Sequence, residues 1–272
     1  MTESILNPVK SIADIDDPIA KKTLEELIEE PHVLGIMLWG SRATGFGSPD
    51  TDWDVLIYCT DVYFQSLAPK DIAIIVFDEN AGPKRLVCDY SYLSDMVFEQ
   101  QLESPLDIDH FAYVEGVVIH DPTGKLEEWR RKLARYPGEE HIDRVKIKWI
   151  QLVTAFYYAQ VVNKRGFISD RQVNLYRTIT IAVNFWFTLQ KSWTPPFKWW
   201  TNHVKRLGMD DETYGIFSKA LETPSIEAVG LLIKHLQELA DKSGHDFKNF
   251  QEDFLETIMP SGRQKFIRHG YL

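Results

Sequence analysis

The feature that most constrains the fold is a change in hydrophobic pattern near Tyr136. Before it, short apolar runs such as His32–Gly40 and Asp52–Thr60 alternate with turn segments, which is typical of strands joined by loops. After it, apolar residues recur at helical spacing over long segments. The two patterns predict an α+β fold. We expect a small mixed β-sheet with helices on one face over residues 1–135, then an all-helical bundle over residues 136–272.

Several further segments complete the expected first half. Asp17–Glu30 begins with Asp and Pro and continues with apolar residues at helical spacing, which predicts a helix. Asp71–Glu79 and Lys84–Tyr92 are expected to be the third and fourth strands, joined through a turn containing Gly82. Ala112–Asp121 is also expected to be extended.

Charge and composition narrow the class of protein. The net charge of −10 argues against a general nucleic-acid binder, which is usually basic. Residues 1–135 hold 12 Lys and Arg against 25 Asp and Glu, whereas residues 136–272 hold 18 against 15. Either this uneven charge serves to bind a metal and an anionic ligand between the acidic and the basic half, or it is chance surface charge.

Neither a membrane anchor nor a secretory leader is expected. No apolar run reaches the roughly 18 residues that a membrane helix needs, and the first residues lack the pattern of a signal peptide. Cys59 and Cys88 both lie inside apolar runs, which indicates buried thiols rather than a disulfide or a metal site. We therefore expect a cytoplasmic protein.

The stretch LWGSRATGFGSPDTDWDVLIY, Leu38–Tyr58, contains the strongest chemical signal. Alternate side chains of a strand share a face, so Asp52 and Asp54 point the same way with Cα atoms roughly 6–7 Å apart. Two such carboxylates repel each other unless a cation or hydrogen-bond donors lie between them. Mg²⁺ prefers one or two protein carboxylates together with substrate phosphates. The pair therefore predicts a Mg²⁺ site completed by a nucleoside triphosphate.

The residues before the loop suit a phosphate. Gly40 ends a strand without a side chain, so a phosphate can approach the backbone there. Ser41 opens what we expect to be a helical turn that offers N–H groups and a hydroxyl to an anion. Arg42 either reaches a phosphate or is simply solvated. Gly-Ser or Asp-x-Asp alone is a weak signal for such a site. The full pattern is far more specific, because Gly-Ser follows one strand and Asp-x-Asp stands, after a loop, on the next strand.

This arrangement resembles the signature of the polymerase-β-like nucleotidyltransferase superfamily. The resemblance implies a third carboxylate on a later strand, which would be Asp89 in RLVCDYS, with Asp78 as the competing candidate. Thr51 stands before the first acid where many relatives have Ser, and it keeps a hydroxyl. More loosely, the whole chain is similar to bacterial enzymes with an appended helical domain, such as the aminoglycoside and lincosamide adenylyltransferases.

Two further segments add to the resemblance. VVIHDPTGKLEEWRRKLARYP resembles the strand, Asp-Pro-x-Gly and helix that follow the core in such proteins. PPFKWW, residues 195–200, resembles a Pro-x-x-Lys-Trp element of some relatives, so Lys198 is a candidate contact to the nucleotide. Trp199 and Trp200 either stack on a base or close the helical core.

The resemblance implies a nucleotidyltransferase domain over residues 1–135 and a helical domain over 136–272. Asp52 and Asp54 would hold two Mg²⁺ ions, and Asp89 would hold the second ion or take the acceptor's proton. Gly40, Ser41, Arg42, Thr51 and Lys198 would contact the nucleotide, with ATP as the expected co-substrate.

Three functions remain open at this point: nucleotidylation of a small molecule, of a protein or tRNA, or nucleotide sensing without catalysis. The first is favoured, with an antibiotic as one candidate acceptor. We expect no membrane partner, nucleic acid is disfavoured, and a homodimer remains open.

Overall fold

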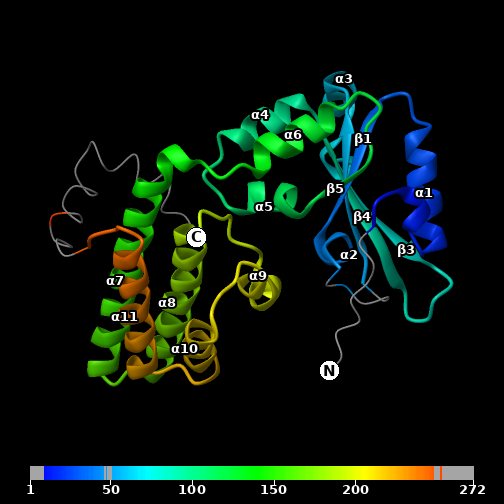
Figure 1. Cartoon of the computed structure of the whole chain (residues 1–272). Helices are drawn as coiled ribbons and strands as arrows, with labels where there is room; N and C mark the ends of the chain where they lie inside the picture. Colours follow the sequence, from blue (N-terminus) through cyan, green and yellow to red (C-terminus); the bar gives the residue numbers. More distant parts are fainter. Residues whose placement is uncertain (1–8, 46, 48–50, 248–251, 253–272) are drawn as a thin grey trace. The chain divides into compact units, whose positions relative to one another are not determined.

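The structure, a computed structural model, describes residues 9–45, 47, 51–247 and 252. It confirms the α+β class. The chain divides into two compact units (Figure 1). The first unit holds residues 1–104 and 109–135, and the second holds Pro105–Ile108 together with Tyr136–Leu272. Four residues near the end of the first half therefore belong to the helical unit.

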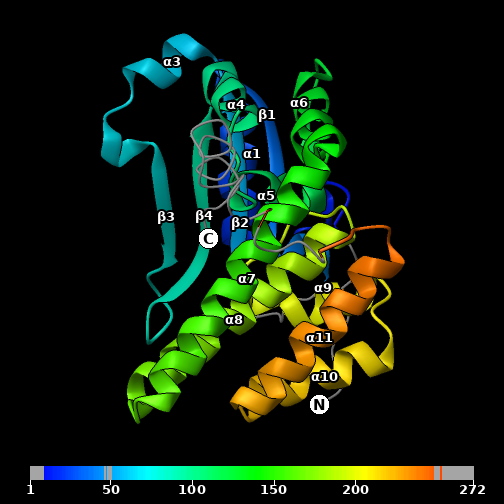
Figure 2. The same cartoon turned by 90° about the vertical axis from the view of Figure 1, so that its left-hand side faces the viewer.

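A five-stranded mixed sheet forms the centre of the first unit, with the strand order β3-β4-β2-β1-β5. The β2 and β4 strands run parallel and every other pair is antiparallel. Figure 2 shows the antiparallel β3 and β4 side by side. The strands are β1 (Val33–Trp39), β2 (Trp53–Cys59), β3 (Ala73–Asp78), β4 (Arg85–Leu93) and β5 (Val117–His120).

Helices cover both faces of this sheet, so the expectation of helices on one face is wrong. Ile36 and Leu38 of β1 pack in one buried cluster with Leu24 of the helix α1 (Pro18–Ile28). Met37 between them packs in a second cluster with Phe98 of the helix α4 (Asp95–Leu102). Figure 1 shows α1 and α4 on opposite sides of the sheet. Because neighbouring residues of a strand point to opposite faces, a strand that is apolar throughout has to be covered twice.

The helices of the first unit precede, connect and follow the strands. Asp17 caps the first of them, and its carboxylate accepts hydrogen bonds from the backbone N–H groups of Ile19 and Ala20. The helices are α1 (Pro18–Ile28), α2 (Gly40–Thr44), α3 (Asp61–Ser66), α4 (Asp95–Leu102), α5 (Ile108–Glu115) and α6 (Lys125–Ala134).

The expected strand over Ala112–Asp121 is wrong in its first half. The helix α5 runs to Glu115, and only the residues from Val117 to His120 are extended. Tyr113 is buried on this helix beside Phe98 and Trp129. The chain changes from helix to strand at Gly116, where an added Cβ would lie 2.5 Å from the sulfur of Met37.

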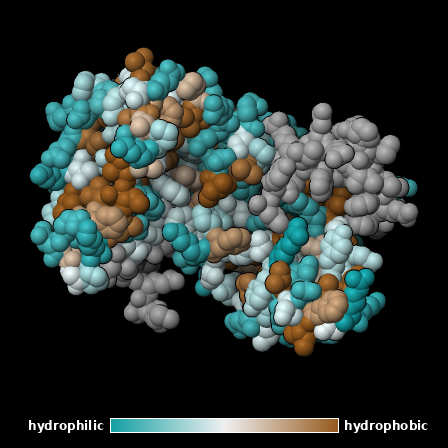
Figure 3. All heavy atoms as spheres, turned by 180° about the vertical axis from the view of Figure 1, so that it is seen from behind, coloured by the Kyte–Doolittle hydropathy of each residue, from teal (hydrophilic) through white to brown (hydrophobic). Residues whose placement is uncertain are grey.

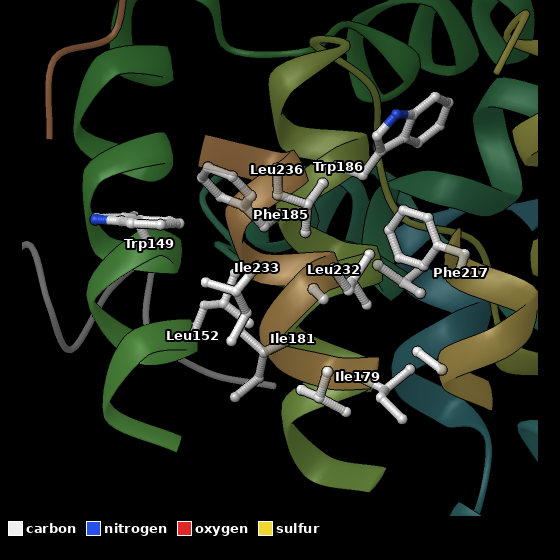
Figure 4. Close-up of a cluster of buried hydrophobic side chains, with 14 of the residues drawn as sticks. Trp149, Leu152, Ile179, Ile181, Phe185, Trp186, Phe217, Leu232, Ile233 and Leu236 are labelled. Carbon is white, nitrogen blue, oxygen red and sulfur yellow. The ribbon is translucent and has the colours of Figure 1, made fainter. Parts of the chain in front are cut away.

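The second unit is a helical bundle built around α7 and α8, which form its most extensive helix pair. Its helices are α7 (His141–Lys164), α8 (Ile168–Leu189), α9 (Trp200–Arg206), α10 (Asp211–Glu222) and α11 (Ile226–Lys242). Figure 4 shows the buried side chains that these helices contribute to one cluster. The labelled residues are Trp149, Leu152, Ile179, Ile181, Phe185, Trp186, Phe217, Leu232, Ile233 and Leu236.

Two other expectations concern the thiols and the membrane. Cys59 and Cys88 are free and buried in the sheet, and burial raises the pKa of each thiol to about 12. None of the described helices is long and apolar enough to cross a membrane. Hydrophobic side chains do occur on the surface, where Figure 3 shows them gathered in patches between hydrophilic residues.

Candidate active site

Three acidic residues meet where β2 begins. Asp54 is the second residue of β2, and it pairs in register with Trp39 of β1 on one side and with Asp89 of β4 on the other. Because residues in register on neighbouring strands share a face, the two carboxylates lie side by side. Asp52 lies two residues before Asp54, at the spacing that returns a side chain to the same face.

The three carboxylates form a compact cluster. Each of Asp52, Asp54 and Asp89 offers one oxygen, and these oxygens all lie within 4.8 Å of one another. All three residues are half-buried, which reduces screening of their mutual repulsion by water. Carboxylate oxygens are the ligands that hard divalent cations such as Mg²⁺ prefer. The donor set therefore fits a cation of this kind.

Gly40 leaves the space that this cluster needs. Its φ of +77° lies in the left-handed region, which favours glycine. A Cβ atom at this position would lie 1.8 Å from Oδ2 of Asp54, a distance that no pair of non-bonded atoms tolerates. The turn after β1 is therefore fitted to the Asp54 carboxylate, and only a residue without a side chain leaves that carboxylate in place.

The loop between Gly-Ser and the acids folds back on its own start. The Gly47 N–H donates a hydrogen bond of 2.8 Å to the Ser41 carbonyl oxygen. An added Cβ on Gly47 would lie 2.7 Å from Oγ1 of Thr51, so the Thr51 hydroxyl lies against this loop. Ser41 is the second residue of α2, directly after Gly40. Residues 46 and 48–50 of the signature lie outside the described residues.

Arg42 is buried rather than solvated, with 3% of its surface exposed. Its Nε donates a 3.0 Å hydrogen bond to the Thr51 carbonyl oxygen, and its Nη1 lies 3.2 Å from the Asp16 carboxylate. The guanidinium carbon also lies 4.7 Å from the centre of the Trp53 ring. These contacts hold the start and the end of the loop together, and they lend no support to the predicted contact between Arg42 and a nucleotide.

Asp78, the competing candidate for the third acid, does not join the cluster. It ends the edge strand β3, where it pairs in register with Arg85 and forms an ion pair of 3.6 Å with its guanidinium. The same guanidinium also binds Asp17 at 2.6 Å. Burial raises the pKa of that carboxyl group, but the hydrogen bonds from the Ala20 N–H and from Arg85 outweigh it, and the pKa is lowered. The structure thus brings Asp89 to the other two acids and gives Asp78 a different partner.

The remaining predicted residue, Lys198, belongs to the helical unit, so its contact with a nucleotide stays a prediction. Its ammonium lies 4.8 Å from the centre of the Trp199 ring. Trp199 is buried in the helical unit, which favours the core interpretation for this residue, whereas Trp200 is half-buried.

Sequence reasoning missed Asp16, which supports the loop through Arg42. The two residues are 26 positions apart, and no motif links them, so nothing in the sequence signalled the pair.

Comparisons with known proteins add little to this geometry. Residues 109–200 match the model of a family described as a domain of unknown function, DUF4037. No curated protein matches the chain. Among solved structures, it is similar to a nucleotidyltransferase-like protein from Exiguobacterium sibiricum 255-15. The identity is 15% and the TM-score 0.48, over 93% of this chain and 91% of the other.

Proposed function

We propose that the protein is a Mg²⁺-dependent nucleotidyltransferase. It would transfer a nucleoside monophosphate from a nucleoside triphosphate, with ATP as the first candidate, to a hydroxyl group of a small molecule. One observation carries the proposal. The parallel register of β2 and β4 sets Asp89 directly beside Asp54, with Asp52 completing a group of three carboxylates. The resemblance of the Gly-Ser and Asp-x-Asp motif to the polymerase-β-like nucleotidyltransferases implies the same arrangement of three acids.

In the proposed reaction, the acceptor oxygen forms a bond to the α-phosphorus and the bond from this phosphorus to the oxygen of the departing pyrophosphate breaks. When bound, two divalent ions would stabilise the charge on the attacking and leaving oxygens. Asp52, Asp54 and Asp89 are the residues that would hold them. Gly40 and Ser41 would supply open backbone next to the acids, where the triphosphate has to lie.

The hydroxyl proton of the acceptor also needs a destination. A carboxylate within hydrogen-bond reach can take it as a general base. Asp89 is the candidate, because the resemblance assigns the position of the third acid either to the second metal ion or to this proton. A pH profile of turnover for Asp89→Glu and Asp89→Asn separates the two roles. A base shifts the acidic limb of the profile, whereas a metal ligand changes the Mg²⁺ concentration that gives half-maximal rate.

The first experiment measures binding, which requires no knowledge of the acceptor. The full chain is mixed with each nucleoside triphosphate, with and without Mg²⁺, and its unfolding temperature is recorded. A ligand at 100 times its Kd stabilises a protein by about 2.7 kcal/mol. We expect stabilisation by at least one triphosphate that requires Mg²⁺ and is lost in Asp52→Asn and Asp54→Asn.

The second experiment measures pyrophosphate release over a panel of hydroxyl-bearing acceptors. Each single Asn variant at positions 52, 54 and 89 should lower turnover by at least about a hundredfold, the scale seen when a group that stabilises the transition state is removed. Asp78→Asn is the matched control, because it removes an acid from the neighbouring strand outside the cluster. Unchanged pyrophosphate release in the double variant at positions 52 and 54 would refute the proposal.

A further inference from the structure

The exposed side chains of the edge strand β3 are apolar. Along this strand, exposed and half-buried side chains alternate regularly. The exposed set is Ala73, Ile75 and Phe77, which we call the apolar strip, and Ile75 and Phe77 leave 58% and 43% of their surfaces open. An antiparallel strand that is covered on one side normally carries polar residues on its open side. An open side that is apolar along the whole strand is typical of a binding surface.

The apolar strip faces the side of the sheet on which α4 and α6 lie. The alternate residues Ile74 and Val76 pack against the buried cluster on the α1 side, so the strip points the other way. Among the described residues, the buried cluster beneath α4 and α6 takes strand side chains from β1, β2, β4 and β5, and none from β3. These two helices therefore cover the inner strands and leave the strip open.

The strip lies directly beside the acidic cluster. Ile75 pairs in register with Asp89, which pairs in register with Asp54 on its other side. Residues in register share a face, so these three side chains form one row across the sheet. Phe77 lies two residues further along β3, at the spacing that returns a side chain to the same face. Because neighbouring strands are about 4.8 Å apart, the strip begins one strand away from the candidate general base.

The charged residues at the end of the β3–β4 hairpin are paired with one another. The Lys84 ammonium lies 2.7 Å from the Glu79 carboxylate. The Arg85 guanidinium lies 2.6 Å from Asp17 and 3.6 Å from Asp78. Each of these groups already has a partner of opposite charge, so this end of the strip favours an uncharged ligand.

From these observations we infer that the acceptor of the proposed reaction is an uncharged alcohol with an apolar group close to its reacting hydroxyl. The apolar group packs on Ile75 and Phe77 while the hydroxyl lies beside Asp89. The strand spacing places the start of the apolar group within about 5 Å of the hydroxyl oxygen. The inference rests on the proposed nucleotidyl transfer and names the class of its acceptor. An aminoglycoside, which is polycationic and has little apolar surface, does not match this strip.

The test compares alcohols that differ in the group next to the hydroxyl. The full chain, with Mg²⁺ and the triphosphate that stabilises it, is given 2-phenylethanol, 2-cyclohexylethanol or ethylene glycol, and the nucleotidylated alcohol is measured by mass spectrometry. We expect at least one of the two apolar alcohols to have a kcat/KM about tenfold or more above that of ethylene glycol, the scale expected when a group of this size leaves water.

A second measurement detects binding without turnover. The same alcohols are studied by saturation-transfer NMR in the presence of Mg²⁺ and an α,β-methylene triphosphate, which cannot transfer its nucleotide. We expect saturation of the phenyl or cyclohexyl protons in the wild type and a clear loss in the double variant described next.

Variants then assign the preference to the strip. The double variant Ile75→Thr, Phe77→Thr keeps residues that suit a strand and removes exposed apolar surface, so the fold should survive. It should lower kcat/KM for the apolar alcohols about fivefold or more and leave ethylene glycol and the triphosphate-dependent stabilisation unchanged. Val62→Thr is the matched control, because Val62 is 81% exposed on α3, outside the sheet.

The inference is overturned if neither apolar alcohol exceeds ethylene glycol, or if the double variant leaves kcat/KM and the NMR signal unchanged. It is also overturned if the double variant converts a dimer to a monomer in light scattering, since a second copy would then cover the strip. These results leave the proposed function standing as long as the wild type binds a triphosphate with Mg²⁺. A wild type without such binding refutes the proposed function, and the inference with it.

Discussion

Replacing Gly40 by alanine tests how closely the turn after β1 is fitted to the acidic cluster. The change has two separable effects. An L-residue in the left-handed region costs about 1–2 kcal/mol. In addition, the new Cβ would lie 1.8 Å from Oδ2 of Asp54 and 2.7 Å from its Cγ, so the carboxylate has to rotate away. We therefore expect a modest loss of stability and a larger loss of cation binding.

Gly124 provides a matched control for the first effect. Its φ of +74° is nearly the same as that of Gly40, and an added Cβ there meets nothing within 4 Å. Gly124→Ala should therefore lose the same 1–2 kcal/mol of unfolding free energy and keep the cluster intact. The difference between the two variants isolates the displacement of Asp54.

Mn²⁺ serves as the probe, since its binding is read directly by electron paramagnetic resonance. We expect Gly40→Ala to bind Mn²⁺ about 10–100-fold more weakly than the wild type, the range seen when the support of a metal ligand is lost. Gly124→Ala should match the wild type, and denaturant unfolding should show similar stability losses in both. Equal Mn²⁺ affinity in the two variants would show that the turn does not position Asp54.

Three further predictions concern stability. Arg42→Ala should lower the unfolding free energy, measured in urea, by about 2–3 kcal/mol, since it removes buried hydrogen bonds of a charged group. Asp16→Ala changes the exposed ion-pair partner of Arg42 and should lower the unfolding free energy by less than about 1 kcal/mol. Burial and, less strongly, Arg206 lower the pKa of His203 to about 4. As the pH falls from 6.5 to 4, the unfolded chain therefore binds a proton at this residue before the folded chain does, and the free energy of unfolding decreases. His203→Gln should reduce this decrease. An unchanged dependence of the unfolding free energy on pH would contradict the role given to His203. The raised thiol pKa values of Cys59 and Cys88 make the protein less stable as the pH rises rather than as it falls. Stability should fall between about pH 9 and 12, and a thiol reagent at pH 8 should react only as fast as the protein unfolds.

Local patterns in the sequence predicted the elements of the sheet closely. Four apolar runs became β1 to β4, with ends that differ by one or two residues from the expected ones. These strands are long enough, and rich enough in branched and aromatic residues, for periodicity to identify them. The helical second half followed from the same kind of pattern.

The errors arose where an apolar run had no clear period. Residues 112–121 were expected to form one strand, yet the helix α5 continues to Glu115 because Tyr113 packs against Phe98 and Trp129. Short apolar segments do not distinguish a buried helix from a strand. Helix coverage of both faces was missed for a related reason, since it depends on packing between distant segments.

The candidate site was predictable in its local part only. Gly40, Asp52 and Asp54 stand in one contiguous motif, so spacing alone brought them together. The choice of Asp89 over Asp78 depended on a parallel pairing between strands some thirty residues apart, and the preference rested on resemblance.

The four residues Pro105–Ile108 have a consequence for how this protein can be divided. The chain passes from one unit to the other three times, so no single cut separates them. A truncated chain that starts at residue 136 would lack Asp107, and the buried guanidinium of Arg144 would lose its ion pair. Exchange of the helical unit between related proteins would therefore have to carry a short internal segment as well as the C-terminal half.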